Sequence, residues 1–378
     1  MSIIIGADLV PTNSNSILFS QGRVDELFGT ELLSELRKVD FRIFNLETPL
    51  SDSVTPIEKI GSALIAPTST VAAMKRIPID LFTIANNHIM DQGESGFKST
   101  CNALTEAGIP FVGAGRTREE AEKPYVFSTK GGKIGVYACA EHEFSIVTDH
   151  SSGANPVDLL ETPDHIVKLK HMCDFVIVLY HGGKEYYRYP SPMLQKVCRK
   201  LIDKGADLII CQHSHCIGSY EYYGAGCIVY GQGNFIFDDG EMECLQDGML
   251  IKIDDQFELS FLPIRRRQNC IRLADEKNAA RVLAELNARS KMILQYDMVE
   301  NLYKEFAKSY LNFYLGNLHG HVRKRFVYRV VNRLTKRKLE RWYFMRQYQK
   351  EDILGLRNYI ECEAHQELLL AGLLSNER

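Results

Sequence analysis

The sequence predicts an α/β fold followed by a helical extension, and three observations support this. From residue 2 to about residue 240, short apolar runs alternate with amphipathic stretches, the pattern of strands followed by helices. Beyond about residue 270 this pattern stops, and the sequence is typical of helices almost without interruption. The length of 378 residues also exceeds the usual size of one domain. We therefore expect a main domain at residues 1–270 and a helical C-terminal extension at residues 271–378.

The expected strands are short runs rich in β-branched and aromatic residues. They lie at residues 2–5, 41–45, 81–85, 133–140, 175–180, 207–211 and 227–230, with a final hairpin at 249–253 and 258–264. Helices are expected between them. Residues 191–204, for example, carry Met193, Val197 and Leu201 at a spacing of four, and Gly205 ends the pattern. We expect this apolar stripe to pack on the sheet.

The composition excludes several classes of protein. With 45% hydrophobic and 25% charged residues, the chain is typical of a folded soluble protein. A net charge of -3 argues against a general nucleic-acid binder. The ten cysteines form no C-x-x-C pair, which favours small buried hydrophobic residues in a reducing compartment. Since neither a secretory signal nor a membrane span is recognisable, we expect a cytoplasmic protein.

The charge is distributed unevenly, because residues 322–350 carry eleven basic residues and one acid, Glu340. Apolar residues recur there at every fourth position, at Val322, Phe326, Val330 and Leu334, so the segment is expected to form a basic amphipathic helix. Such a helix could contact an anionic membrane surface or polymer. The favoured interpretation is a docking helix whose apolar face covers the acidic main domain. Both interpretations remain open.

Polar residues cluster directly after the expected strands. In an open α/β sheet, ligands collect at the carboxyl ends of the strands, so five segments point to one place. The residues in these positions are Asp8, Asn45 and Glu47, Asn86 to His88, His181, and His213 with His215.

Two carboxylates, amides and three imidazoles, with no thiolate, form a ligand set that suits Mn, Fe or Zn. Two histidines two residues apart on a strand, such as His213 and His215, could simply be hydrogen-bonded core residues. The addition of His181, Asp8 and Glu47 at other strand ends favours a metal site.

Six ordered motifs between residues 2 and 240 resemble those of the CapA family. They are Gly6-Ala7-Asp8, Asn-Leu-Glu-Thr-Pro-Leu at 45–50, Ala-Asn-Asn-His at 85–88 with Asp91 and Gly93, His-Gly-Gly-Lys-Glu-Tyr at 181–186, Gly-Ala-Asp at 205–207 leading to His213-Ser214-His215, and Gly-Gln-Gly-Asn-Phe at 231–235. Members of this family are capsule-synthesis proteins associated with poly-γ-glutamate and related surface polymers. The family resembles calcineurin-like metallophosphoesterases, which implies a β-sandwich flanked by helices.

The same resemblance implies roles for individual residues, with His88 as general acid or charge stabiliser. Val10 stands where the D-x-H motif of the superfamily has histidine, so one ligand is missing. A two-metal site stabilises both the attacking and the leaving oxygen, and loss of a ligand weakens one half of it. We therefore expect one tight and one weak divalent ion. The implied ligands are Asp8, Glu47, Asn87, His181, His213 and His215.

The other motif residues allow two interpretations each. Asp91 either orients His88 or forms a turn before Gly93. Glu185 lines the substrate cleft or caps a local helix, and Arg188 holds a carboxylate or phosphate of the substrate or lies in a solvated loop. Asn234 sits between close backbone segments or in a tight turn. The residues predicted to bind substrate are Asn45, Glu185, Arg188 and Asn234.

Three functional hypotheses follow. The leading one is a CapA-like metal-dependent hydrolase that acts in the synthesis, modification or release of an anionic capsule or surface polymer, either poly-γ-glutamate or polysaccharide. Its partners would be the polymer or its precursor and a membrane synthase complex, reached through the 322–350 helix at the membrane periphery. The second is a cytoplasmic phosphoesterase for a small phosphate ester. The third is a non-catalytic assembly component that keeps the metal for structure.

Overall fold

A computed structural model describes residues 2–59, 61–237, 240–318, 330–331, 333–335, 338, 348, 350–361 and 365. The chain divides into two compact units, Met1–Glu300 and Asn301–Arg378. The first unit continues past residue 270, because helix α8 (Glu276–Ile293) packs on strands of the main domain.

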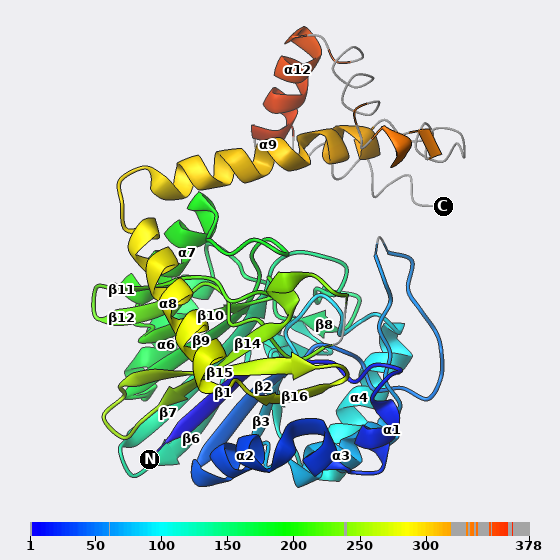
Figure 1. Ribbon diagram of the computed structural model, residues 1–378, viewed down its shortest axis with the longest axis vertical. Helices are drawn as coiled ribbons and strands as arrows, with labels where there is room; N and C mark the ends of the chain where they lie inside the picture. The colour runs from blue at the N-terminus through cyan, green and yellow to red at the C-terminus, as the bar shows by residue number, and fades with distance from the viewer. Residues whose placement is uncertain are drawn as a thin grey trace. The chain divides into compact units, whose positions relative to one another are not determined.

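The first unit contains two large sheets, shown in Figure 1. In the first sheet, β1 to β4 are parallel, β14 to β16 are antiparallel, and β13 also pairs with β1. In spatial order, its strands are β16 (Cys270–Leu273), β15 (Leu259–Arg267), β14 (Asp247–Ile253), β1 (Ile3–Leu9), β2 (Phe41–Leu46), β3 (Leu81–Thr83) and β4 (Phe111–Val112), with β13 at Asn234–Ile236.

The second sheet has a parallel centre with an antiparallel strand at each edge. In spatial order, its strands are β11 (Tyr220–Tyr223), β12 (Gly226–Val229), β10 (Leu208–Gln212), β9 (Phe175–His181), β7 (Gly132–Ala140) and β6 (Tyr125–Thr129). Two further short strands, β5 (Ala114–Gly115) and β8 (Gly153–Ala154), pair separately.

The two sheets pack face to face with helices outside them. Alternate residues of a strand point to opposite faces, and β9 illustrates this. Ile177 and Leu179 join the core shared with the first sheet, while Val176 and Val178 face the helical side. The helices are α1 (Ser16–Ser20), α2 (Val24–Lys38), α3 (Val71–Arg76) and α4 (Gly93–Ala107) with the first sheet, α6 (Thr162–Met172) and α7 (Pro192–Asp203) on the second, and α5 (Arg118–Glu122) beside β5. The predicted β-sandwich flanked by helices is confirmed.

The predicted strands and the final hairpin are all present, and the expected helix at residues 191–204 is α7. The Ser191 side chain caps α7 by accepting a hydrogen bond from the N–H of Leu194. Strands β4, β5, β6, β8, β11, β13 and β16 were not expected from the sequence, because they are short or carry many polar residues. Short strands give too few alternations to be recognised by pattern.

After the last strand the chain is helical, with α8 in the first unit, α9 (Met298–Leu318) across the boundary between the units, and α12 (Lys350–Glu361) in the second unit. The predicted basic helix at 322–350 lies almost entirely outside the described residues. Within the part of the chain that the structure describes, none of the helices combines the length and the apolar character that crossing a bilayer requires.

Candidate metal centre

The predicted ligands of the first sheet come from neighbouring parallel strands. Asp8 in β1 lies in register with Asn45 of β2 and with Asn234 of β13, and Glu47 directly follows β2. Gly6 lets β1 lie close to the Phe44 ring of β2, because a Cβ atom at residue 6 would lie 2.1 Å from Cε1 of Phe44. The pairing register of β1 with β2 shifts between Ile5 and Asp8, so an irregularity in β1 positions Asp8.

The second sheet contributes the imidazoles. His181 is the last residue of β9, and His213 comes directly after β10. Because the core strands of both sheets end at the same edge of the sandwich, side chains from two sheets meet there.

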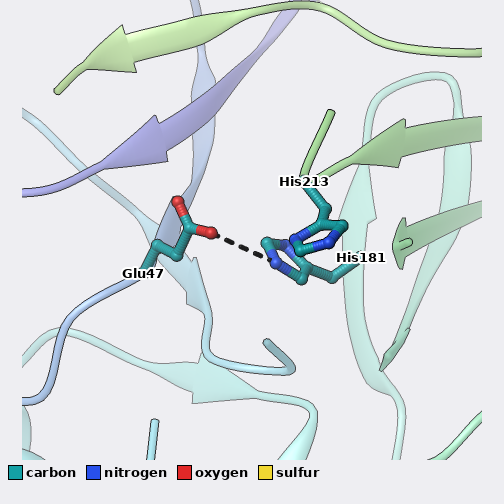
Figure 2. A group of neighbouring side chains, drawn as sticks. All are labelled: Glu47, His181 and His213. Atoms are coloured by element: carbon teal, nitrogen blue, oxygen red, sulfur yellow. Dashed lines mark ion pairs between the residues drawn. The ribbon is translucent and has the colours of Figure 1, made fainter. Parts of the chain in front are cut away.

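Two groups of three ligands form at this edge. In Glu47, His181 and His213, as in Asp8, Glu47 and His215, the ligand atoms lie within 4.8 Å of one another. Figure 2 shows the first group, with Glu47 facing both imidazole rings. The Asn87 Oδ1 atom lies 3.0 Å from Nε2 of His181, so Asn87 belongs beside the first group. Glu47 belongs to both groups, as a ligand that bridges two ions would.

These residues fit a divalent ion because several of their buried polar atoms lack a hydrogen bond. Oε1 of Glu47 lies 3.2 Å from Nε2 of His181, but this contact does not have hydrogen-bond geometry. An unsatisfied buried polar atom costs about 1–3 kcal/mol, which coordination of a cation would offset. Among the described residues, atoms of this kind in the site are Asp8 Oδ2, Glu47 Oε1 and Oε2, His213 Nδ1 and Asn234 Nδ2.

The backbone of the histidine pair is strained. His213 has φ of 91° and His215 has φ of 55°, in a region that residues other than glycine rarely occupy. Strand β10 ends at Gln212, so the two histidines follow the strand, as expected, and the alternative of two core histidines on a strand does not hold. Such residues cost about 1–3 kcal/mol each and gather at functional sites. The turn brings His213 into the group with Glu47 and His181, and His215 into the group with Asp8 and Glu47.

Burial and neighbouring charges set the protonation of the site. Burial lowers the pKa of His215, but the charges of Glu47 and Asp8 outweigh burial and raise it to about 10. Burial together with the charges of His181 and His215 holds the pKa of His213 well below its ordinary value, so this imidazole is neutral. Burial raises the pKa of Asp8, but contacts with His215 and the charge of His181 leave it below its ordinary value. An ionised carboxylate and a neutral imidazole are the forms that bind metal.

Asn45 and Asn234, two of the residues predicted to bind substrate, contact the side chains of implied metal ligands. Asn45 is fully buried, and its Nδ2 donates to Asp8 Oδ1 at 2.7 Å and lies 3.3 Å from Nδ1 of His181. Its Oδ1 accepts a hydrogen bond from Asn86 at 3.0 Å. Oδ1 of Asn234 lies 2.9 Å from Nδ1 of His215. Both placements favour positioning of ligands over contact with substrate.

His88 is held by a buried carboxylate. Oδ2 of Asp91 lies 2.5 Å from Nδ1 of His88 and accepts a hydrogen bond from the N–H of Leu64 at 2.6 Å. The Asp91 side chain is fully buried. Of the two interpretations of Asp91, the structure favours orientation of His88, which leaves Nε2 of His88 as the nitrogen that can exchange a proton.

Lys59 also belongs to this site, although it was not expected from the sequence. Its Nζ lies 2.6 Å from Oδ1 of Asp91, 3.3 Å from the carbonyl oxygen of Asn87 and 3.4 Å from Nδ1 of His88, and its side chain is only 4% exposed. Lys59 lies in a long irregular loop after Glu47, where hydrophobic periodicity gives no signal. In the sequence, this role is indicated only by the position of a lysine in the loop that follows the motif containing Glu47.

Glu185, Arg188 and Val10 have different surroundings. Glu185 is exposed, but its carboxylate forms a third group with His213 and His215 within 4.8 Å. Arg188 pairs with Glu243 at 2.7 Å, so the structure places its guanidinium on a protein carboxylate. The Val10 side chain is buried in the core, and its N–H bonds to the carbonyl of Ile236 at 2.8 Å. Val10 therefore offers no ligand, as expected.

Comparisons with known proteins show which proteins this chain is similar to. The chain is 32% identical over 187 residues to "Capsule biosynthesis protein CapA" of Bacillus anthracis, covering 47% of this chain and 44% of that protein. It is 30% identical to "PGA biosynthesis protein CapA" of Bacillus subtilis, covering 45% and 46%. The chain thus spans less than half the length of these relatives. Among solved structures, a novel phosphatase from Mycoplasma pneumoniae matches 71% of this chain and 94% of its own, with 14% identity and a TM-score of 0.46.

The family comparison covers the implied ligands together with His88, Asp91 and Lys59, and it ends before the helical extension. The model of the family described as "Bacterial capsule synthesis protein PGA_cap" matches residues 5–239, which include all six implied ligands. Since this match extends over most of the chain, the protein belongs to the bacterial capsule synthesis family PGA_cap.

Proposed function

We propose that this protein is a metal-dependent hydrolase that acts on an anionic capsule or surface polymer during its synthesis, modification or release. The observation that carries the proposal is the pair of ligand groups joined at Glu47, whose buried atoms lack hydrogen bonds. The names of the two Bacillus relatives, which refer to capsule and PGA biosynthesis, support the polymer as substrate.

We further propose that the two ions bind with unequal strength. Glu47, Asn87, His181 and His213 would hold one ion with four side chains. Asp8, Glu47 and His215 would hold the other with three, because Val10 contributes none. The mixed oxygen and nitrogen ligands suit Mn, Fe or Zn.

The chemistry divides between the ions and the chain. A bound divalent ion would lower the pKa of water and polarise a phosphoryl or acyl oxygen. The chain orients its own ligands through Asn45 and Asn234. His88, fixed at Nδ1 by Asp91, would deliver a proton from Nε2 to the leaving group.

The basic segment at 322–350 supports a proposed partner. Its eleven cationic side chains suit an anionic polymer, or the anionic surface of a membrane that carries a synthase complex. A vesicle-sedimentation assay with anionic and neutral lipids, using the full chain, would distinguish the surface from the polymer.

The test of the proposed function compares substrates and variants. Protein stripped of metal and reloaded with Mn is incubated with poly-γ-glutamate, capsular polysaccharide and a panel of phosphate esters, and new chain ends or free phosphate are measured. We expect Mn-dependent cleavage of a polymer that is lost in His88→Ala while Mn binding is retained. The exposed His150 supplies a matched control, because His150→Ala should keep full activity.

Two results would contradict the proposal. Robust turnover of small esters with no action on polymer would favour a small-molecule phosphoesterase. Unchanged polymer cleavage or production with His88→Ala would exclude the catalytic role of His88 and favour an assembly component.

A further inference from the structure

Glu185 has a placement that the six implied ligands do not explain. It lies in the loop that follows β9, with an exposed side chain whose carboxylate faces His213 and His215. The three ligand atoms lie within 4.8 Å of one another. Two ligands about 2.1 Å from the same ion are separated by up to about 4 Å, so a small adjustment would bring the Glu185 carboxylate and the His215 imidazole to one cation.

The loop is tied to the histidine pair through its backbone. The N–H of Tyr186 donates to the carbonyl oxygen of Ser214 at 2.9 Å, between the two histidines. The Tyr186 ring lies 6.2 Å from the His215 ring. These contacts hold Glu185 beside His215 even though its side chain is exposed.

Backbone strain marks both of the facing segments. Tyr186 has φ of 60°, in the same unusual region as His213 and His215. Strain of this kind persists where the surroundings impose it, and it gathers at ligand sites. Both the loop and the turn are therefore held in the conformation that brings Glu185 to the histidines.

The charge of an anionic substrate argues against Glu185 as its binding residue. The site already contains the carboxylates of Asp8 and Glu47, and a further carboxylate would repel a polymer of carboxylates or phosphates. The same carboxylate becomes favourable when it shares a cation with His215. The negative charge of Glu185 therefore favours binding of a cation over binding of an anionic substrate.

We propose that Glu185 is a metal ligand, which completes the ion site of Asp8, Glu47 and His215 from the solvent side. It takes the part of the imidazole that is missing at Val10. This inference rests on the proposed metal-dependent function and names a residue of the weaker site.

Calorimetric titration of metal-stripped protein with Mn tests the assignment. We expect wild type to bind two ions. Glu185→Gln should weaken the weaker site by about 10–100-fold and leave the tighter site within about threefold, because only one side chain is changed. Glu31→Gln, an exposed acid on α2, is the matched control and should bind both ions like wild type.

A second readout does not depend on activity. Two Mn ions that share a ligand give a coupled electron paramagnetic resonance spectrum, and Glu185→Gln should replace it with the spectrum of a single Mn at the same metal concentration. Because Glu185 is exposed, the circular dichroism spectrum and the melting temperature in EDTA should stay unchanged.

The failure of this inference differs from the failure of the proposed function. If Glu185→Gln binds both ions as wild type does, Glu185 is not a ligand, while the metal-dependent function stands. An equal loss of affinity at both sites overturns the assignment to the His215 side. If wild type binds no Mn, both the inference and the proposed function fail.

Discussion

Replacement of Lys59 by methionine tests the buried ion pair that holds His88. Methionine keeps the length and apolar character of the side chain but removes its charge. In the structure, Nζ of Lys59 lies 2.6 Å from Oδ1 of Asp91, and neither side chain is more than 4% exposed. Lys59→Met would therefore leave a buried carboxylate without its cationic partner.

The expected loss of stability in Lys59→Met depends on the contacts that Asp91 retains. Two unit charges 2.6 Å apart attract by about 6 kcal/mol at an effective dielectric constant of about 20, before the cost of desolvation. Removal of one partner of a buried pair typically costs about 3–5 kcal/mol. Asp91 retains its contacts with Nδ1 of His88 and the N–H of Leu64, so we expect a loss of about 3 kcal/mol.

Urea unfolding, followed by far-ultraviolet circular dichroism, measures this loss. Lys98→Met is the matched control, since Lys98 is exposed on α4, and its effect should stay within about 0.5 kcal/mol. Asp91→Asn and the double variant complete a cycle in which the coupling between Lys59 and Asp91 should be about 2 kcal/mol. A loss below about 1 kcal/mol for Lys59→Met, with a coupling near zero, would refute the buried pair.

Three further predictions concern the metal site and the backbone beside it. Mn at 100 times its dissociation constant should stabilise wild type by about 2.7 kcal/mol, and Glu47→Gln should abolish most of this gain, measured as the melting temperature with Mn against EDTA. Gly248→Ala places a methyl group 2.1 Å from the carbonyl oxygen of Asn234 and should cost about 1–3 kcal/mol in urea unfolding, whereas Gly131→Ala meets no neighbour within 3.6 Å and should be nearly neutral. The pKa of His215 is lowered by burial but raised further by Glu47 and Asp8, to about 10, so in EDTA its stabilising contribution is fully present below about pH 6.5 and is lost as pH rises through about 10. Urea midpoints from pH 6 to 10 should fall in wild type and change less in Glu47→Gln; an equal slope in both would contradict this linkage.

The positions of the ligands could be predicted because strand ends are visible in the sequence. An apolar run followed within three residues by Asp8, Glu47 or His181 identifies both the strand and the edge to which its polar residue belongs. Once the fold is a sandwich, these edges meet, and the ligand groups observed here follow. The strand pattern therefore carried information about the site as well as the fold.

The roles of Lys59 and Asn45 could not be predicted in this way. Lys59 reaches Asp91 from an irregular loop, and the path of such a loop depends on local hydrogen bonds such as that from Thr55 N–H to Gln92 Oε1 at 2.7 Å. Asn45 stands at a strand end like the ligands, so its position alone does not show whether it faces the metal or supports Asp8. Its hydrogen bonds with Asp8 and Asn86 favour the supporting role, and such hydrogen bonds are a property of the packed structure.

The origin of each ligand suggests why the two ion sites should differ. Glu47, His181 and His213 are all buried, and they come from or directly follow strands whose register is fixed by both sheets. Rigid, desolvated ligands lose little freedom when they bind an ion, which favours tight binding. Glu185 is exposed and belongs to a loop, so its ordering would reduce the affinity that it adds. An ion site completed from such a loop would therefore bind its ion more weakly than the site built from Glu47, His181 and His213.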